Sequence, residues 1–136
     1  MIKVIIGKKG TGKTKILVDM VNSAVESATG NVVCIEKGTK LTYDVKHSAR
    51  LVDISAYGVS GYQGVYSFVA GMLAANYDIK EIFIDGIFRM AGDDQAGLSE
   101  FVSMLEKLDS EVDFVLTVSA DASEVADNVK ACIINK

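Results

Sequence analysis

Short apolar runs alternate with longer one-sided apolar stripes along this chain, and this alternation limits the fold more than any other feature. The runs have the length of buried strands, whereas the stripes recur with the spacing of amphipathic helices. Strands that alternate with helices pair in parallel, with right-handed crossovers that cover both faces of one sheet. We therefore predict an α/β fold, a three-layer sandwich around a mainly parallel sheet.

The positions of the runs and stripes give the expected elements. The predicted strands are Ile2–Ile6, Asn31–Glu36, the short extra strand Leu51–Ile54, Glu81–Asp85, Val112–Val118 and Ala131–Ile134. The predicted helices are Lys13–Ala28, a helix with the apolar face Val65–Leu73, Gln95–Asp109 and the short Ser123–Val129. The chain has 136 residues and shows no internal repeat or linker, so we predict one domain over residues 1–136.

The charge of the chain narrows the choice of ligand. With 14 basic and 18 acidic residues, the net charge is −4, whereas general binding to nucleic acid or to an anionic membrane needs a basic face. We therefore expect neither as a partner. Four lysines nevertheless crowd one short segment, at Lys8, Lys9, Lys13 and Lys15. Such a local cationic site in an acidic protein indicates a small anion.

The hydropathy pattern also bears on location. No stretch of the sequence reaches the about 18 apolar residues that would span a membrane, and the first apolar run is too short for a secretory signal. We therefore expect a cytoplasmic protein.

The segment Gly7–Thr14 matches the pattern G-x-x-x-x-G-K-[ST] at every fixed position. It follows a predicted strand and opens a predicted helix, which is the context that this motif requires. Glycines allow the backbone to fold back so that its N–H groups converge on a phosphate. The first turn of the helix adds unpaired N–H groups and the positive end of its dipole. We predict that a nucleotide is bound by Gly7, Lys8, Lys9, Gly10, Thr11, Gly12, Lys13 and Thr14.

Two side chains of this segment have more specific expected roles. Lys13 can reach the β- and γ-phosphates as a point charge, and Thr14 can present its hydroxyl to Mg²⁺ that bridges those phosphates. Lys8 and Lys9 stand at variable positions of the motif. They either contact the phosphates or remain solvated and only raise the local potential.

A second candidate metal ligand follows a later strand. The run Ile82–Ile84 is apolar and is followed by Asp85, and an acid at the carboxyl end of a parallel strand points into the crevice where such sheets bind ligands. Asp85 is therefore a candidate ligand for Mg²⁺. An ordinary strand that ends in an Asp-Gly turn is the alternative.

These two elements resemble those of the P-loop NTPase superfamily. With Asp85 on the third core strand, the chain is similar to the RecA-like branch, and more narrowly it resembles small stand-alone bacterial ATP-binding proteins labelled twitching-motility ATPases. The resemblance implies the core strand order 5-1-4-3-2 and the cofactors ATP (or another NTP) and Mg²⁺. It also implies a polar sensor of the γ-phosphate at the tip of the fourth strand, where Ser119 or, as the second choice, Thr117 lies. A helix cap or turn is the alternative role for Ser119.

The sequence departs from many hydrolysing members of that branch at one position. They carry a glutamate directly after the strand acid to activate water, and this chain has Gly86 there. Asp93 and Asp94 follow nearby, but we expect them to cap the next helix, and Asp53 is a less favoured base. Arg89 either assists phosphoryl transfer or forms a surface salt bridge.

Three remaining features have structural predictions. Cys34 and Cys132 would lie on opposite edges of the implied sheet, so we predict free thiols. They and the single histidine lack the spacing of a metal site. The loop Tyr57–Gly64 carries tyrosines among glycines, which either stack on a nucleotide base or a partner or cover sheet edges.

The predicted function is binding of ATP and Mg²⁺ with slow or partner-stimulated hydrolysis, in which Lys13 and Ser119 are the candidate catalytic residues. A nucleotide-gated interaction module that never turns over is the alternative, and a small-molecule kinase is less expected. We also expect a protein partner, because one small domain carries no separate output domain. The guanine-reading sequence N-K-x-D does not occur, which favours ATP or loose base choice.

Overall fold

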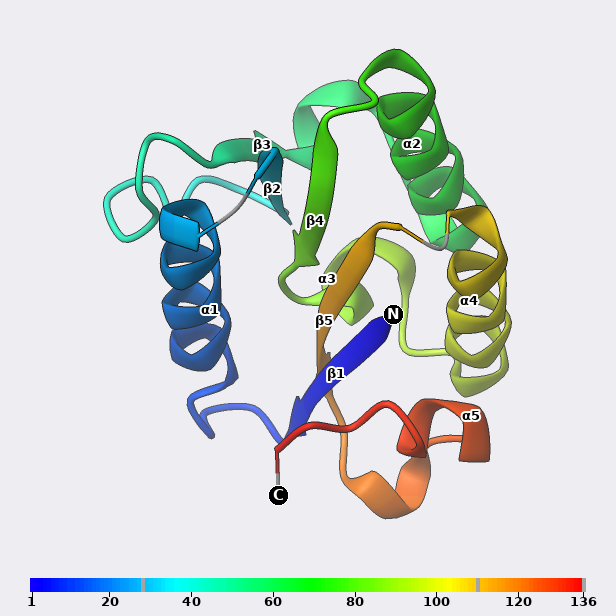
Figure 1. The fold of residues 1–136 in the computed structure, drawn as a ribbon. Coiled ribbons are helices and arrows are strands. Elements are labelled where there is room, and N and C mark those ends of the chain that lie inside the picture. Colours follow the sequence, from blue (N-terminus) through cyan, green and yellow to red (C-terminus); the bar gives the residue numbers. More distant parts are fainter. Residues whose placement is uncertain (28, 110, 136) are drawn as a thin grey trace.

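The computed structural model describes residues 1–27, 29–109 and 111–135. In these residues one parallel sheet has the strand order β1-β5-β4-β2-β3 (Figure 1). The strands are β1 (Ile2–Gly7), β5 (Asp113–Ser119), β4 (Ile79–Ile84), β2 (Asn31–Glu36) and β3 (Arg50–Asp53). The predicted α/β class with a parallel sheet is therefore confirmed.

The predicted strand order is confirmed as well. Strands 1, 4, 3 and 2 of the expected order 5-1-4-3-2 correspond to β1, β5, β4 and β2, and the short extra strand forms β3 outside β2. The last predicted strand lies beside β1 as expected, but it is an extended segment with a single bridge, between Val4 and Ile133. Two hydrogen bonds hold it there, from Val4 N to Cys132 O (2.8 Å) and from Ile134 N to Val4 O (2.9 Å).

Helices cover both faces of the sheet. One face is covered by α1 (Lys13–Ser27), whose Leu17 and Val21 pack with alternate strand residues such as Phe83. The other face is covered by α2 (Gly61–Ala75), α3 (Ile87–Ala91), α4 (Gln95–Leu108) and α5 (Asp127–Lys130). Figure 1 shows the sheet between α1 on one side and α2 with α4 on the other, so the fold is a three-layer sandwich.

Some predicted helix boundaries differ from the structure. The end predicted at Ala28 lies outside the described residues. The short helix predicted over Ser123–Val129 is divided into a 3₁₀ turn, η2 (Ala122–Glu124), and α5. Asp121 caps the 3₁₀ turn, because its carboxylate accepts a hydrogen bond from Ser123 N (3.0 Å) in a capping box. The turn therefore begins at Ala122, one residue before the predicted helix start. A second 3₁₀ turn, η1 (Ile54–Tyr57), follows β3.

The tyrosines of the 57–64 loop pack against the domain itself. The ring of Tyr57 lies 5.5 Å from that of Phe68, and the ring of Tyr62 lies 5.6 Å from that of Phe101. The Tyr62 hydroxyl also donates a hydrogen bond to Gly92 O (2.6 Å). These contacts favour the interpretation that the tyrosines cover the fold.

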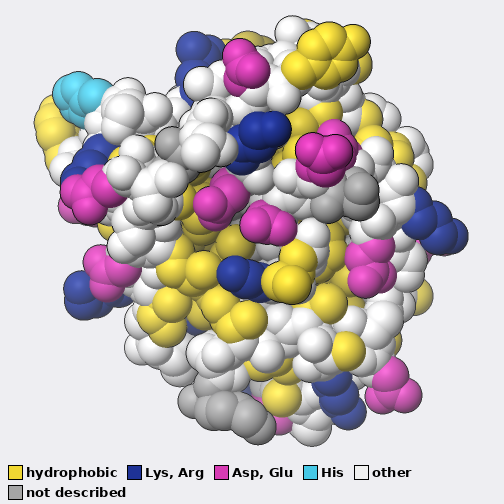
Figure 2. All heavy atoms as spheres, viewed as in Figure 1, with side chains coloured by type: hydrophobic (Ala, Val, Ile, Leu, Met, Phe, Trp, Pro, Cys, Tyr) yellow, Lys and Arg dark blue, Asp and Glu magenta, His cyan; other side chains and the backbone are white. Residues whose placement is uncertain are grey.

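The cysteines and the surface complete this description. Cys34 is buried in β2, Cys132 lies beside β1, and both are free, as predicted. In the described part of the chain, no helix has both the length and the apolar character needed to cross a membrane. On the face shown in Figure 2, basic side chains are interspersed with acidic ones.

Parallel strands end at one edge of the sheet, and this edge gathers the candidate site. The turn after β1, Asp85 after β4 and Ser119 at the end of β5 all lie there. Glu36 and Asp53 end β2 and β3 at the same edge, where they are paired in register.

Candidate functional site

The Gly7–Thr14 turn joins β1 to the amino terminus of α1, and the helix begins at Lys13. Gly10 and Gly12 have φ angles of 83° and 85°, a left-handed conformation that strains residues with a side chain. Thr11 Oγ1 donates a hydrogen bond to Lys8 O (2.7 Å), which closes the turn on itself. The glycines of the motif are therefore required by the backbone conformation.

Lys13 folds back over this turn. Its side chain is largely buried (8% exposed), and its Nζ donates a hydrogen bond to Lys8 O at 3.0 Å. Burial lowers the pKa of Lys13, the charge of Arg89 lowers it further, and the negative charge of Asp85 opposes both effects. Lys8 and Lys9 are exposed. The turn therefore holds one ammonium group against its own backbone and carries two exposed ones at its surface.

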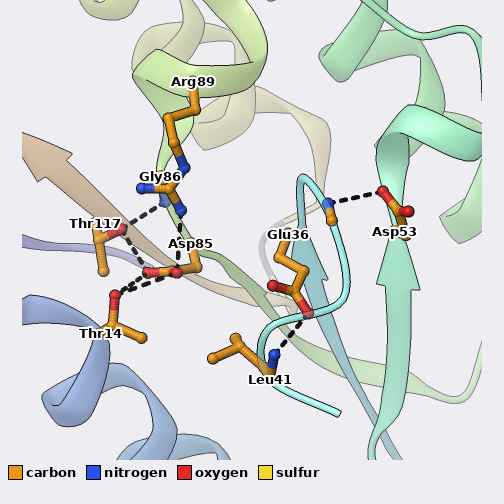
Figure 3. Close-up of polar contacts among 9 residues, drawn as sticks. Thr14, Glu36, Leu41, Asp53, Asp85, Gly86, Arg89 and Thr117 are labelled. Carbon is orange, nitrogen blue, oxygen red and sulfur yellow. Dashed lines mark hydrogen bonds and ion pairs between the residues drawn. The ribbon is translucent and has the colours of Figure 1, made fainter.

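Asp85 is the centre of the polar network (Figure 3). Its side chain is 4% exposed. Thr14 Oγ1 lies 3.2 Å from Asp85 Oδ1 and 3.3 Å from Oδ2, so the sequence-predicted metal ligands are in contact. Thr117 Oγ1 donates to Asp85 Oδ1 (2.9 Å) and accepts a hydrogen bond from Gly86 N (2.6 Å). The Thr117 hydroxyl thus fixes the carboxylate that faces Thr14.

Arg89 completes the surroundings of Asp85. It lies one helical turn later, on α3, and its Nη2 is 3.3 Å from Asp85 Oδ2. The salt bridge predicted for Arg89 therefore exists, but its partner is buried. The guanidinium lies over Gly86, where a Cβ atom would collide with it, and Gly86 also has a φ of 77°. The left-handed conformation at position 86 favours glycine over glutamate, and a side chain there would also have to displace the Arg89 guanidinium.

Glu36 is a site residue that the sequence reasoning missed. It ends β2, the neighbour of β4, and it is 2% exposed. Its Oε2 accepts a hydrogen bond from Leu41 N (3.1 Å). Burial raises the pKa of Glu36, and the negative charges of Asp85 and Asp53 raise it further, against the hydrogen bonds from the backbone. The signal in the sequence is an apolar run that ends in an acid, the same form as the run before Asp85.

The structure separates the other candidates from Asp85. Asp53 is on the outer strand, and its Oδ1 accepts hydrogen bonds from Gly38 N (2.9 Å) and from Ser55. Ser55 and Gly38 lower the pKa of Asp53, so this carboxyl is a turn residue rather than a base. Asp94 caps α4 by accepting from Ala96 N (3.1 Å), as predicted.

Ser119 and Thr117, the two candidates for a polar sensor at the tip of β5, lie in different surroundings. Ser119 is exposed and lies opposite Gly7 in register, at the start of the turn. Thr117, two residues earlier, is buried and contacts Asp85. Ser119 therefore lies at the exposed edge of the sheet, whereas Thr117 belongs to the hydrogen-bond network of Asp85.

An open cavity of about 650 Å³ adjoins the network. Its lining includes Lys9 from the turn, Arg89 from α3 and Ser119 from β5, together with Asp93, Gln95 and Glu124. The Oε1 atom of Gln95 is buried and has no hydrogen-bond partner among the described residues. The cavity lining therefore contains both cationic groups and hydrogen-bond acceptors.

The donor set fits Mg²⁺ better than a softer metal. Thr14 and Asp85 supply a hydroxyl and a carboxylate, the oxygen ligands that Mg²⁺ prefers, and Mg²⁺ in nucleotide sites commonly uses one or two protein ligands with phosphates and water. In residues 1–27, 29–109 and 111–135, no group of three His, Cys, Asp or Glu side chains forms a metal cage. A magnesium ion at Asp85 would therefore depend on phosphate oxygens for its remaining ligands.

No protein-family profile and no curated protein matches this chain. The functional argument therefore depends on the geometry of the site.

Proposed function

We propose that this protein binds ATP with Mg²⁺ in the manner of a P-loop NTPase and hydrolyses it slowly or on stimulation by a partner. One observation carries the proposal. The turn of the phosphate-binding motif presents the amino terminus of α1, and its Thr14 contacts Asp85 from a separate strand. A chance match to the motif would not place the second predicted metal ligand against the first.

The turn supplies the phosphate-binding groups. Backbone N–H groups at the start of the 15-residue helix α1 have no helical acceptor, and the helix dipole adds positive potential there. Lys13 adds a full charge that the fold holds against the turn. A polyphosphate is the ligand that satisfies these groups together.

Thr14 and Asp85 are the residues that would hold the metal. Mg²⁺ bound with the nucleotide would neutralise charge on the terminal phosphates. Thr117 orients Asp85 for this role, because its hydroxyl holds Oδ1. The buried position of this carboxylate keeps competing water away from it.

Slow hydrolysis is supported by the distribution of acids. Gly86 supplies no side chain to activate water, and Arg89 covers that position. Glu36, which ends the strand beside β4, is the other buried carboxyl at this edge, and its raised pKa makes it the candidate to accept a proton. Its hydrogen bond to Leu41 N ties it to the loop after β2, so a partner that moves this loop would change hydrolysis.

The cavity favours a second candidate function, phosphoryl transfer to a small acceptor. The open cavity of about 650 Å³ next to Gly86 and Arg89 has charged and amide side chains in its lining, which could bind a polar acceptor beside a nucleotide. A kinase would consume ATP only when an acceptor is present. A nucleotide-gated interaction module would instead bind ATP without turnover. For each of these functions, we also propose a protein partner and a cytoplasmic location.

The test compares wild-type protein with Lys13→Ala and with Lys15→Ala, an exposed lysine two residues later. We expect Lys13→Ala to weaken ATP binding in Mg²⁺ at least about tenfold, the effect of one charge-assisted hydrogen bond, while Lys15→Ala binds nearly as wild type. Phosphate release over many turnovers, measured with the same three proteins, separates hydrolysis from binding alone. Equal ATP affinity of wild type and Lys13→Ala would refute the proposal.

A further inference from the structure

The pairing of Arg89 with Asp85 places a protein cation where the proposed function needs a metal cation. Arg89 Nη2 is 3.3 Å from Asp85 Oδ2, the same oxygen that lies 3.3 Å from Thr14 Oγ1. Arg89 forms the single salt bridge to Asp85 in the described part of the chain. A buried carboxylate needs such compensation, because burial of an unpaired charge is costly.

The two ends of this salt bridge differ in exposure and in the number of contacts that hold them. The Asp85 side chain is 4% exposed and is fixed by Thr14 and Thr117, whereas the Arg89 side chain is 49% exposed. The Arg89 backbone is anchored, since Arg89 N donates to Gly86 O (2.9 Å) and Lys37 Nζ donates to Arg89 O (3.2 Å). The guanidinium can therefore leave Asp85 by side-chain rotation while α3 stays in place.

The adjoining cavity gives the guanidinium a second position. Arg89 lines this cavity together with Lys9 and Ser119, on the side of the phosphate-binding turn. Gly86 has no side chain to block the passage between Asp85 and the cavity. A guanidinium that leaves Asp85 would remain near the terminal phosphate of a bound nucleotide, an anion that it can pair with.

We propose that Arg89 is an exchangeable counterion of Asp85: it neutralises this carboxylate in the nucleotide-free protein and is displaced toward the cavity when Mg²⁺ and nucleotide bind. The inference rests on the proposed function. Arg89 and Mg²⁺ compete for one carboxylate, so the salt bridge sets how strongly nucleotide binding depends on Mg²⁺.

The first test measures the competition directly. Mn²⁺, a spectroscopic substitute for Mg²⁺, is titrated into protein saturated with ADP and followed by electron paramagnetic resonance. We expect Arg89→Ala to bind Mn²⁺ about tenfold more tightly than wild type, the factor for losing one charged hydrogen bond that the metal must otherwise break. Arg89→Lys should fall between them, and Arg50→Ala, which changes the other arginine of the chain, should match wild type.

The second test observes Arg89 in the wild-type protein and uses one variant only for assignment. The chain has two arginines, so the wild-type protein gives two Nε–Hε signals in a ¹⁵N spectrum. Comparison with Arg50→Ala assigns them. We expect Mg²⁺ with ADP to shift the Arg89 signal and to leave the Arg50 signal in place, and ADP alone to shift it less.

The outcomes separate the two proposals. An Arg89 signal that does not move at saturating Mg²⁺ and ADP, or an unchanged Mn²⁺ affinity in Arg89→Ala, would overturn the role of Arg89 while nucleotide binding stands. Failure of wild-type protein to bind ADP at all would overturn the proposed function and this inference with it.

Discussion

Replacement of Thr117 by valine tests whether the polar network around Asp85 is a structural unit. The Thr117 side chain is buried, and its hydroxyl links Asp85 Oδ1 (2.9 Å) to Gly86 N (2.6 Å). Valine has nearly the same shape and keeps the branched side chain that suits a strand. The substitution therefore removes one hydroxyl and little else.

The size of the effect follows from the two lost hydrogen bonds. The buried Gly86 N–H loses its acceptor, which costs about 1–3 kcal/mol, and Asp85 loses a charged hydrogen bond worth about 1.5 kcal/mol or more. We expect the free energy of unfolding to fall by about 3 kcal/mol. The entropy of unfolding is about 0.3 kcal/mol/K for 136 residues, so the Tm should fall by about 10 °C.

Urea and thermal denaturation followed by circular dichroism measure this loss. Thr39→Val is the control, because Thr39 is exposed in the loop after β2, and its Tm should stay within about 2 °C of wild type. A loss below about 1 kcal/mol in Thr117→Val would refute the reasoning, since the Gly86 N–H would then have found another acceptor.

Two further predictions concern buried titratable groups. Burial raises the pKa of Glu36 above its ordinary value of 4.5, so the folded protein holds this proton more tightly than the unfolded chain, and stability is lost as the pH rises from 4.5 through the raised value. We therefore expect urea denaturation to show that Glu36→Gln is more stable relative to wild type at pH 7 than at pH 4. A stability difference that does not depend on pH would contradict this. Burial raises the pKa of Cys34 to about 12. In a Cys132→Ser variant, we therefore expect Ellman's reagent to modify Cys34 at pH 8 only after unfolding. Rapid modification of the folded variant would show that the thiol is accessible.

The fold was largely predictable because its signals are local. Apolar runs such as Ile82–Ile84 and the one-sided stripe of α1 identify strand and helix without knowledge of their neighbours. The final segment was harder to predict. Ile133 forms a single bridge to Val4 of β1. The side chain of Asn135 then makes hydrogen bonds with the backbone N–H and C=O of Ile6, so the backbone pairing with β1 does not continue as a strand.

Two parts of the candidate site were placed correctly in the fold from sequence. The Gly7–Thr14 turn is continuous in sequence, and Asp85 follows a parallel strand that ends at the same edge of the sheet. Thr117 and Arg89 contact Asp85 because of the register of β5 and the direction of α3, and Glu36 lies at the same edge because β2 pairs with β4. Sequence reasoning that stops at strand order does not give these positions, since a shift of one residue in a strand turns its side chain to the other face.

The central claim is that the turn between β1 and α1 binds a polyphosphate through its backbone N–H groups. A titration of ¹⁵N-labelled protein with ATP and Mg²⁺, followed amide by amide in ¹H–¹⁵N spectra, tests this directly. We predict that the largest shifts occur in the amides of residues 8–14 and that they are lost in Lys13→Ala. Unchanged amides in this turn at millimolar ATP, or shifts confined to another part of the sheet, would contradict the account.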